Sequence, residues 1–473
     1  MINKTKIIAT IGPSTQSRDM LRRLVVRGVN VCRINFSHST HQQAKEIIDN
    51  IKSINKELHT HTAILADLQG PKIRVGAFKK PIKLIKGSSV YFNTTINKTE
   101  DIYISYTNFP KDVKKGDRVL LDDGKLSLLV EETNKKSRVK LKVVFGGELK
   151  SNKGVNLPNT IISLPCLTIK DKEDLVFILE EEIEWIGLSF VRNSQDVKTL
   201  KGIIKRHKKS KALVIAKIEK PEAIEDIDNI ILETDAIMVA RGDLGVEVPL
   251  HKVPVYQKMI VQKCIRQSKP VVIATQMLES MTDNISATRA EVNDVANSVI
   301  DGADAMMLSG ETSVGQHPLR VVDTMRKVIK DVERSKHNIS KNREERDLLL
   351  NERYISNAIC ANACKISEQV KAKAIITATY SGYNTIKTSS YRPSAYIYAF
   401  TNNHTILNTL SLIWGVKAFY YEGGKTTDQT ITETKNILKK SKYIKKGDLV
   451  INIASMPAQE KGMTNMMKLS KVK

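Results

Sequence analysis

The sequence has few cysteines, few aromatic residues and no long apolar run. Its 5 cysteines are odd in number, scattered and contain no Cys-x-x-Cys pair, so neither a disulfide framework nor a zinc cluster is expected. Cys360 and Cys364 would share a helix face without a histidine nearby, which favours buried free thiols. No segment approaches the roughly 20 apolar residues of a membrane-spanning helix. The first residues also lack the apolar stretch of a signal peptide, so we expect a reduced, cytoplasmic protein without a membrane partner.

Aromatic residues make up only 5% of the chain, which is little for stacking on nucleic-acid bases. The chain is nevertheless basic, with 75 Lys and Arg against 51 Asp and Glu and a formal charge of +24. Such a charge could indicate a polyanion partner, or simply a lysine-rich surface. Because the basic residues are spread along the whole chain, we expect the second and no nucleic-acid partner.

Two consecutive apolar runs in the middle of the chain end in charged residues. The runs are 213–216 and 236–240, followed by Lys217 and Glu219 and by Arg241 and Asp243. Between them, Pro221 and several acidic residues are typical of a helix start. Either charged pair alone could be an ion pair that closes a strand, but two in succession favour a ligand site.

Similar apolar runs recur through the first two thirds of the sequence. They are 6–13, 29–36, 62–69, 183–190, 213–219, 235–243, 270–277 and 303–311. Helical periodicity follows several of them, at 17–27, 42–56 and 194–207. Eight such strand–helix units predict a (β/α)₈ TIM barrel.

One interval between these runs is far too long for a single unit. The fourth run begins about 120 residues after the third, whereas the others begin roughly 20 to 35 residues apart. The intervening sequence holds β-rich segments at 89–93, 118–121, 126–131 and 138–144, and a hairpin turn signal, Asp122-Asp123-Gly124-Lys125. We therefore expect two barrel segments, 1–70 and 167–340. Between them we expect a small all-β domain, 71–166, which would lie over the C-terminal mouth of the barrel and could act as a lid.

After Val332 the chain becomes highly charged, as in a linker or an exposed helix. A regular alternation follows. Helices are expected at 355–370, 384–391, 405–413 and 428–440, and strands at 374–378, 395–401, 416–420 and 448–453. This pattern predicts a C-terminal, doubly wound α/β domain over 341–473.

A barrel brings the carboxyl ends of all its strands to one mouth. That mouth would collect four cations, Arg33, Arg74, Lys217 and Arg241, and four carboxylates, Asp67, Glu219, Asp243 and Glu311. Each residue alone could be a salt bridge, and His38 could simply support its loop. Together they suit a phosphorylated acid bound through Mg²⁺, with the backbone of 242–245 offering N–H groups to an anion.

The motifs at these strand ends resemble those of the pyruvate kinase family, in the same order along essentially the whole chain. They are KIIATIGPST, CRINFSHST, LADLQGPKIRVG, GLSFVRN, AKIEKPEAI, MVARGDLGVEVP, ATQMLESM, TRAEVNDVANSVIDGADAMMLSGETSVGQHP and TYSG. The resemblance implies the same architecture of barrel, inserted lid and C-terminal α/β domain. It also implies a cytoplasmic homotetramer.

The implied reaction is glycolytic phosphoryl transfer from phosphoenolpyruvate to ADP, which gives pyruvate and ATP through an enolate. By resemblance, Lys217 stabilises the transition state, and Glu219 and Asp243 hold Mg²⁺ or Mn²⁺. The remaining implied roles are substrate binding by Arg33, Lys217, Gly242, Asp243 and Thr275, nucleotide binding by Asn35, Arg74 and Lys170, and proton delivery by Thr275 and Ser309.

Two departures from the family pattern change the expected partners. Many relatives carry an acidic residue where this chain has Lys72, and hold potassium at the positions of Asn35, Ser37, Asp67 and the backbone of Leu68. A fixed ammonium at Lys72 could replace that ion, so we expect that K⁺ is not required and that Asp67 pairs with a protein cation.

The second departure lies in the C-terminal domain. Thr379, Ser381 and Gly382 resemble a turn that binds a sugar-phosphate effector, but Tyr383 and Asn384 stand where activated relatives often have a basic residue followed by a hydroxyl residue. An ordinary helix cap is the alternative for this turn.

Two other functions remain open from the residues alone. A carbon–carbon lyase of the phosphoenolpyruvate type would share the metal and the cations but would need neither the lid nor a nucleotide. A regulatory or RNA-binding protein without catalysis could use the basic surface.

Overall fold

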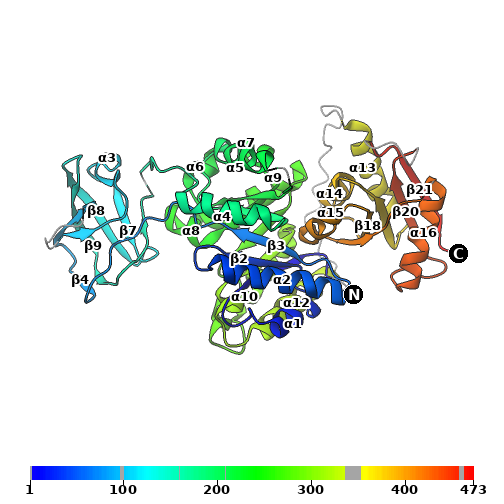
Figure 1. Ribbon diagram of the computed structural model, residues 1–473, viewed down its shortest axis with the longest axis horizontal. Coiled ribbons are helices and arrows are strands. Elements are labelled where there is room, and N and C mark those ends of the chain that lie inside the picture. The colour runs from blue at the N-terminus through cyan, green and yellow to red at the C-terminus, as the bar shows by residue number, and fades with distance from the viewer. Residues whose placement is uncertain are drawn as a thin grey trace.

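The computed structural model describes residues 3–95, 101–158, 160–207, 209–335, 353–424, 426–456 and 463–473. Three bodies lie in a row, with the barrel between a small β-domain and the C-terminal domain (Figure 1). Most of the charged segment after Val332, and the expected domain boundary at 340, lie outside the described residues.

The barrel is a closed sheet of eight parallel strands, in the order β1-β16-β15-β14-β13-β12-β3-β2. The strands are β1 (Lys6–Ile11), β2 (Val31–Asn35), β3 (Ala63–Asp67), β12 (Trp185–Leu188), β13 (Leu213–Ile218), β14 (Ala236–Ala240), β15 (Val271–Ala274) and β16 (Ala305–Leu308). Each lies within one of the expected runs, which confirms the TIM barrel. The runs extend past the paired residues because their last residues leave the ladder at the mouth, where the polar side chains lie.

Helices surround the barrel, and hydroxyl or amide side chains cap several of them, for example Ser17, Thr40, Thr168, Asn193 and Thr288. They are α1 (Arg18–Val26), α2 (His41–Leu58), α4 (Ile169–Glu180), α5 (Ser194–Arg206), α6 (Pro221–Glu225), α7 (Ile227–Glu233), α8 (Arg241–Glu247), α9 (Val253–Gln267), α10 (Arg289–Asp301), α11 (Gly310–Ser313) and α12 (Pro318–Arg334). Their apolar faces pack on the outer side of the strands in one buried cluster.

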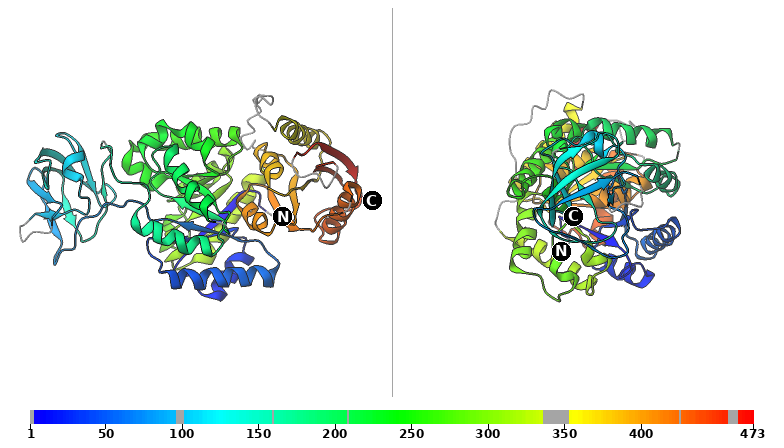
Figure 2. Two further views of the ribbon diagram at one scale, coloured as in Figure 1. Left: turned by 45° about the horizontal axis from the view of Figure 1, so that its top comes forward. Right: turned by 90° about the vertical axis from the view of Figure 1, so that its left-hand side faces the viewer.

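The inserted segment 71–166, here called the lid domain, has its own core and two sheets. Its larger sheet has the order β11-β7-β8-β9-β5-β6, and β10 pairs with β4. The elements are β4 (Ile82–Leu84), β5 (Ser89–Asn93), β6 (Ile102–Tyr103), α3 (Phe109–Asp112), β7 (Arg118–Leu121), β8 (Leu126–Thr133), β9 (Arg138–Phe145), β10 (Gly147–Leu149) and β11 (Val155–Asn156). Seen from its own end of the molecule, this domain lies in front of the barrel (Figure 2).

The C-terminal domain has a five-stranded sheet in the order β19-β18-β17-β20-β21. Its elements are α13 (Tyr354–Gln369), β17 (Ala374–Ala378), α14 (Tyr383–Ser390), β18 (Tyr396–Thr401), α15 (His404–Thr409), β19 (Val416–Tyr420), α16 (Thr427–Lys440), β20 (Leu449–Ala454) and β21 (Met466–Lys471). Four strands are parallel as expected. The antiparallel edge strand β21 was not expected, because its few residues are largely exposed and lack a clear apolar face.

This domain closes the end of the barrel opposite the lid domain. One buried apolar cluster joins the barrel interior to α15 and β18, and the buried ammonium of Lys6 donates to the Val416 carbonyl at 2.6 Å. All five cysteines are buried and free. Among the described helices, none is long and apolar enough to cross a bilayer.

Candidate active site

Lys217 is the charged centre of the mouth. It lies on β13, and its side chain is only 11% exposed. Its Nζ is 3.0 Å from Glu219 Oε1 and 3.2 Å from Asp67 Oδ1, and it donates to Ser189 Oγ at 2.8 Å. Three neighbouring strand ends therefore fix the position of one ammonium group.

Burial alone would lower the pKa of Lys217, but the negative charges of Asp67 and Glu219 outweigh it and raise this pKa above its usual value. For Glu219, burial raises the pKa of the carboxyl group, and the nearby charge of Asp243 adds to that effect. The negative charge of Asp243 that raises the pKa of Glu219 in this way would also favour a bound cation.

Asp67, at the end of β3, holds two cations together. Its carboxylate is 2.6 Å from Arg33 Nη2 as well as 3.2 Å from Lys217. Arg33 Nη1 donates further to Thr10 Oγ1 at 2.9 Å. Burial works to raise the pKa of Asp67, but the charges of Lys217 and Arg33 lower it below its usual value. Asp67 thus pairs with protein cations, as its sequence context suggested.

A small cavity of about 30 Å³ connects these groups. It is lined by Asn35, Ser37, Asp67, Leu68, Gln69, Lys72, Ser189, Phe190, Lys217, Glu219 and Asp243. The structure therefore places Lys217, Glu219 and Asp243 on the wall of one cavity. Lys72 lies on the same wall, beside Asn35, Ser37, Asp67 and Leu68, to which the family resemblance assigned a potassium site. Asn35 Oδ1 accepts from the Ser37 N–H, and the Leu68 carbonyl accepts from Ser189 Oγ.

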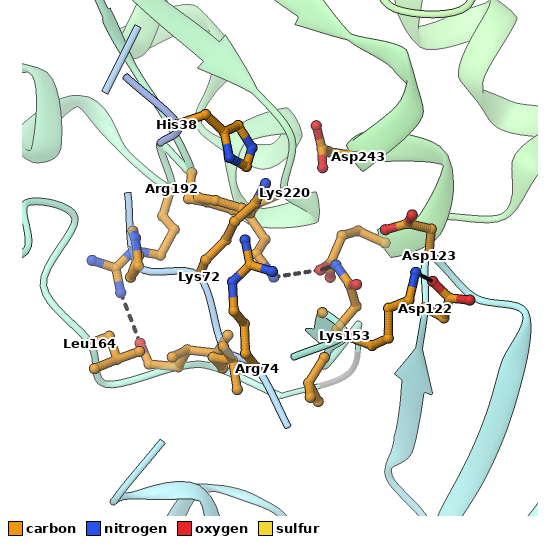
Figure 3. Close-up of a pocket in the computed structure, with 18 residues that line it drawn as sticks. His38, Lys72, Arg74, Asp122, Asp123, Lys153, Leu164, Arg192, Lys220 and Asp243 are labelled. Carbon is orange, nitrogen blue, oxygen red and sulfur yellow. Dashed lines mark hydrogen bonds and ion pairs between the residues drawn. The ribbon is translucent and has the colours of Figure 1, made fainter. Parts of the chain in front are cut away.

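A larger cavity of about 280 Å³ opens between the barrel and the lid domain. It shares Lys72, Phe190 and Asp243 with the small one, so the two are adjacent. His38, Lys72, Arg74 and Lys220 point into it from several elements, opposite Asp243 (Figure 3). Burial first, and then the charges of Lys72 and Arg74, lower the pKa of His38, so its imidazole is neutral at pH 7.

Thr275 and Gly242 meet where β15 and β14 end. Thr275 Oγ1 accepts from the Gly242 N–H at 2.7 Å and donates to the Ala274 carbonyl at 2.6 Å. Thr275 has φ +69, which is unusual for a β-branched residue and indicates local strain at this strand end. Ser309 Oγ, after β16, is buried and has no hydrogen-bond partner among the described residues.

Comparison with known proteins agrees with this geometry. Residues 2–322 match the family model for the pyruvate kinase barrel domain, and residues 357–470 match the model for the pyruvate kinase alpha/beta domain. The chain belongs to the pyruvate kinase family. It is an enzyme of that class, with a glycolytic function.

Named relatives support the same family. The chain is 42% identical to pyruvate kinase 2 of Synechocystis sp., over 99% of this chain and 79% of that protein. It is 41% identical to the pyruvate kinase of Staphylococcus epidermidis, over 99% of this chain and 80% of that protein. A crystal structure of a pyruvate kinase from Cryptosporidium parvum superposes with a TM-score of 0.91, at 35% identity, over 99% of this chain and 96% of that one.

Three residues have partners other than those expected: Arg241 and Glu311, which were expected to face the centre of this pyruvate kinase site, and Lys170, which was expected to contact the nucleotide. Arg241 pairs with Asp294 at 2.7 Å and donates to the Thr275 carbonyl at 2.8 Å. Glu311 accepts from the backbone N–H groups of Ser309 and Leu278. Those N–H groups leave the ladder at the strand ends and need an acceptor, so Glu311 supports loops and pairs with no cation of the described part of the chain.

The third of these residues is Lys170, which lies on α4. It is 2.6 Å from Asp174 Oδ2 and donates to the Phe36 carbonyl at 2.7 Å. Among the described residues, it lines neither of the two cavities. Its nucleotide contact stays a prediction of the family resemblance, and here it holds the loop after β2.

Sequence reasoning assigned no role to Ser189 and Phe190, which follow β12. Ser189 Oγ accepts from Lys217, and the Phe190 N–H donates to Glu219 Oε2 at 2.8 Å. Phe190 adopts φ +55, and a side chain on Gly70 would lie 2.8 Å from its ring. Their position at a strand end was the signal that could have drawn attention to them.

The turn proposed for an effector precedes α14. The Gly382 N–H donates to Thr379 Oγ1, and Gly382 has φ +81, as a tight turn before a helix requires. Tyr383 donates to Asn357 Oδ1 at 2.7 Å, and the Arg353 guanidinium lies 4.3 Å from its ring centroid. A cation therefore lies near the turn, but effector binding by Thr379, Ser381 and Gly382 stays a prediction.

Proposed function

We propose that this protein transfers the phosphoryl group of phosphoenolpyruvate to ADP and protonates the resulting enolate to pyruvate. The observation that carries the proposal is the shared cavity wall of Lys217, Glu219 and Asp243. Phosphoryl transfer needs little covalent chemistry from a protein. It needs fixed positive charge at the migrating group and at the oxygens on either side of it.

In this proposal Lys217 supplies that fixed charge. Asp67, Glu219 and Ser189 hold its ammonium before substrate arrives, so little reorganisation is needed at the moment of reaction. The raised pKa keeps it charged at neutral pH. Lys217 would contact the phosphoryl group. It would also stabilise the enolate oxygen that remains on the substrate when the phosphoryl group leaves.

The carboxylates of Glu219 and Asp243 would hold Mg²⁺ or Mn²⁺. The described residues contain no group of three or more His, Cys, Asp or Glu side chains placed to bind a metal. Two carboxylates on one small cavity fit Mg²⁺, which commonly takes one or two protein carboxylates and fills its other positions with water and substrate oxygens. When bound, the ion would neutralise substrate charge in the cavity.

The remaining residues would bind and orient the substrates. Arg33 and the backbone at Gly242 and Asp243 would contact phosphoenolpyruvate, with Thr275 beside them. Arg74 and Asn35 line the two adjacent cavities, where nucleotide phosphates would approach Lys217. Ser309 and Thr275 are our candidates for delivering the proton, because the family resemblance implies that role and both residues follow strands of the same mouth.

The test is a coupled assay for pyruvate formed from phosphoenolpyruvate and ADP by the purified protein. Pyruvate formation that needs both substrates, with one ATP per pyruvate, is the expected result. A carbon–carbon lyase would ignore ADP, and a regulatory protein would form no pyruvate, so either outcome would reject the proposal.

We predict that activity does not require potassium. Lys72 lines the same small cavity as Asn35, Ser37, Asp67 and Leu68, so its ammonium can supply the charge that a bound K⁺ would supply. The rate is measured in sodium-free tetramethylammonium buffer with and without added K⁺, and it should change less than about twofold. Lys72→Gln should create a many-fold response to K⁺, whereas Lys80→Gln, at an exposed lid lysine, should not. A many-fold response of the unmodified protein would refute the prediction.

A further inference from the structure

A buried ion pair at the edge of the larger cavity has no part in the proposed chemistry. Lys220, just after β13, lies 2.7 Å from Glu247 Oε1, and their side chains are 8% and 1% exposed. A buried ion pair is poor evidence of stability, because taking both charges out of water costs about as much as their attraction returns. Such a pair therefore calls for a role in specificity or positioning.

The third member of this group belongs to the lid domain. Asn156, on β11, donates its Nδ2 to the same Glu247 oxygen at 2.8 Å. β11 pairs with β7 in the large sheet of the lid domain, so the bond crosses between two bodies.

This contact falls on the last residue of α8, the helix that also carries Asp243. Asp243 and Glu247 are four residues apart, so they lie on one face of the helix, and both line the 280 Å³ cavity. Arg74 and Lys72 enter this cavity from the chain that leads into the lid domain (Figure 3). The distance between α8 and the lid domain therefore sets how closely Arg74 can approach Asp243.

We propose that Glu247 is a positioning residue that docks the lid domain on α8 through Asn156, with Lys220 holding its carboxylate in place. A docked lid keeps Arg74 and Lys72 facing Asp243 across the cavity where the nucleotide phosphates would bind. Loss of the bond lets the lid domain move away, while Lys217 keeps its barrel partners Asp67, Glu219 and Ser189. The nucleotide part of this inference rests on the proposed function.

Asn156→Ala tests the inference, because it removes the lid donor and leaves the buried ion pair whole. We expect the KM for ADP to rise about tenfold, as for the loss of a hydrogen bond to a charged group. The KM for phosphoenolpyruvate and the kcat at saturating ADP should change less than about twofold. Asn134→Ala is the matched control, because Asn134 accepts from three backbone N–H groups within the lid domain and should leave every constant unchanged.

A distance measurement tests docking without reference to activity. Spin labels are attached at Lys142→Cys on β9 of the lid domain and Leu232→Cys on α7, both exposed, while the natural cysteines are buried. Asn156→Ala should broaden the distance distribution, and Asn134→Ala should not. An unchanged distribution together with an unchanged KM for ADP would overturn the inference. If the unmodified protein made no pyruvate, the proposed function would fail, while the distance measurement would still decide on docking.

Discussion

Lys217→Met should lower turnover by at least about 10²-fold, the usual cost of deleting a preorganised charge at a developing anion. The methionine side chain fills a similar volume but cannot stabilise the phosphoryl group or the enolate oxygen. Because this stabilisation belongs to the transition state, kcat and kcat/KM should fall together. The coupled assay gives both constants, and a single-turnover measurement confirms that the chemical step is slowed.

The control for this variant is Lys201→Met. Lys201, on α5, also pairs with a carboxylate, Asp235 at 2.9 Å, but it is 31% exposed and lies on an outer helix. It should leave turnover unchanged. Near-ultraviolet circular dichroism checks that the Lys217 variant keeps its fold, since removing the ammonium leaves Asp67 and Glu219 without part of their counter-charge. A folded Lys217 variant with near-normal turnover would remove this residue from its proposed role.

Asp67→Asn should lower the free energy of unfolding of the barrel by about 3–5 kcal/mol at pH 7, which is the usual cost of removing one charged partner of a buried ion pair. The Asp67 side chain is only 2% exposed, and its carboxylate is the partner of both Arg33 and Lys217. The amide can accept hydrogen bonds but cannot neutralise the two buried cations. Turnover should fall as well, because Lys217 loses one of its three anchors.

The pH dependence of this effect has a definite sign. The pKa of Asp67 is lowered in the folded state, so its contribution to stability is complete above the unfolded pKa of about 3.9. That contribution is lost as pH falls through the folded value. The difference between the unmodified protein and Asp67→Asn should therefore be constant from pH 6 to 8 and shrink below about pH 4.

Urea unfolding followed by tryptophan fluorescence measures this difference. The chain has 2 tryptophans, so Trp414→Phe leaves Trp185 on β12 as a reporter of the barrel alone. Asp235→Asn is the matched control, because its pair with Lys201 is partly exposed and worth only about 0–1 kcal/mol. The prediction would be contradicted if Asp67→Asn and Asp235→Asn lowered the free energy of unfolding equally. It would also be contradicted if the difference between the unmodified protein and Asp67→Asn grew as the pH fell.

The barrel could be predicted because its strands are buried on both faces and therefore appear as continuous apolar runs. The polar residues that interrupt those runs mark the strand ends, and all eight ends meet at one mouth. This is why Lys217, Glu219 and Asp243 could be placed together before any coordinates. The inserted domain could also be predicted, because one interval between the apolar runs was too long for a single strand–helix unit.

The partners of individual side chains could not be predicted in the same way. Arg241 and Glu311 stand at strand ends like Lys217, yet they bind Asp294 and backbone N–H groups. Lys170 matches a family motif, yet in the structure it holds the Phe36 carbonyl. A position at a strand end fixes where the Cα atom of a residue lies. The direction of a long side chain then depends on which unpaired polar groups lie within its reach.

The sequence by itself determined the fold and which strand ends carry charged residues, because apolar periodicity and the spacing of strands along the chain can be read from the sequence alone. Only the tertiary structure decided that Asp67 joins Arg33 to Lys217, that Ser189 and Phe190 orient the central charges, and that Asn156 of the lid domain reaches Glu247 on α8. These contacts join residues far apart in the chain. Their formation depends on angles and distances between packed elements, which no local pattern records.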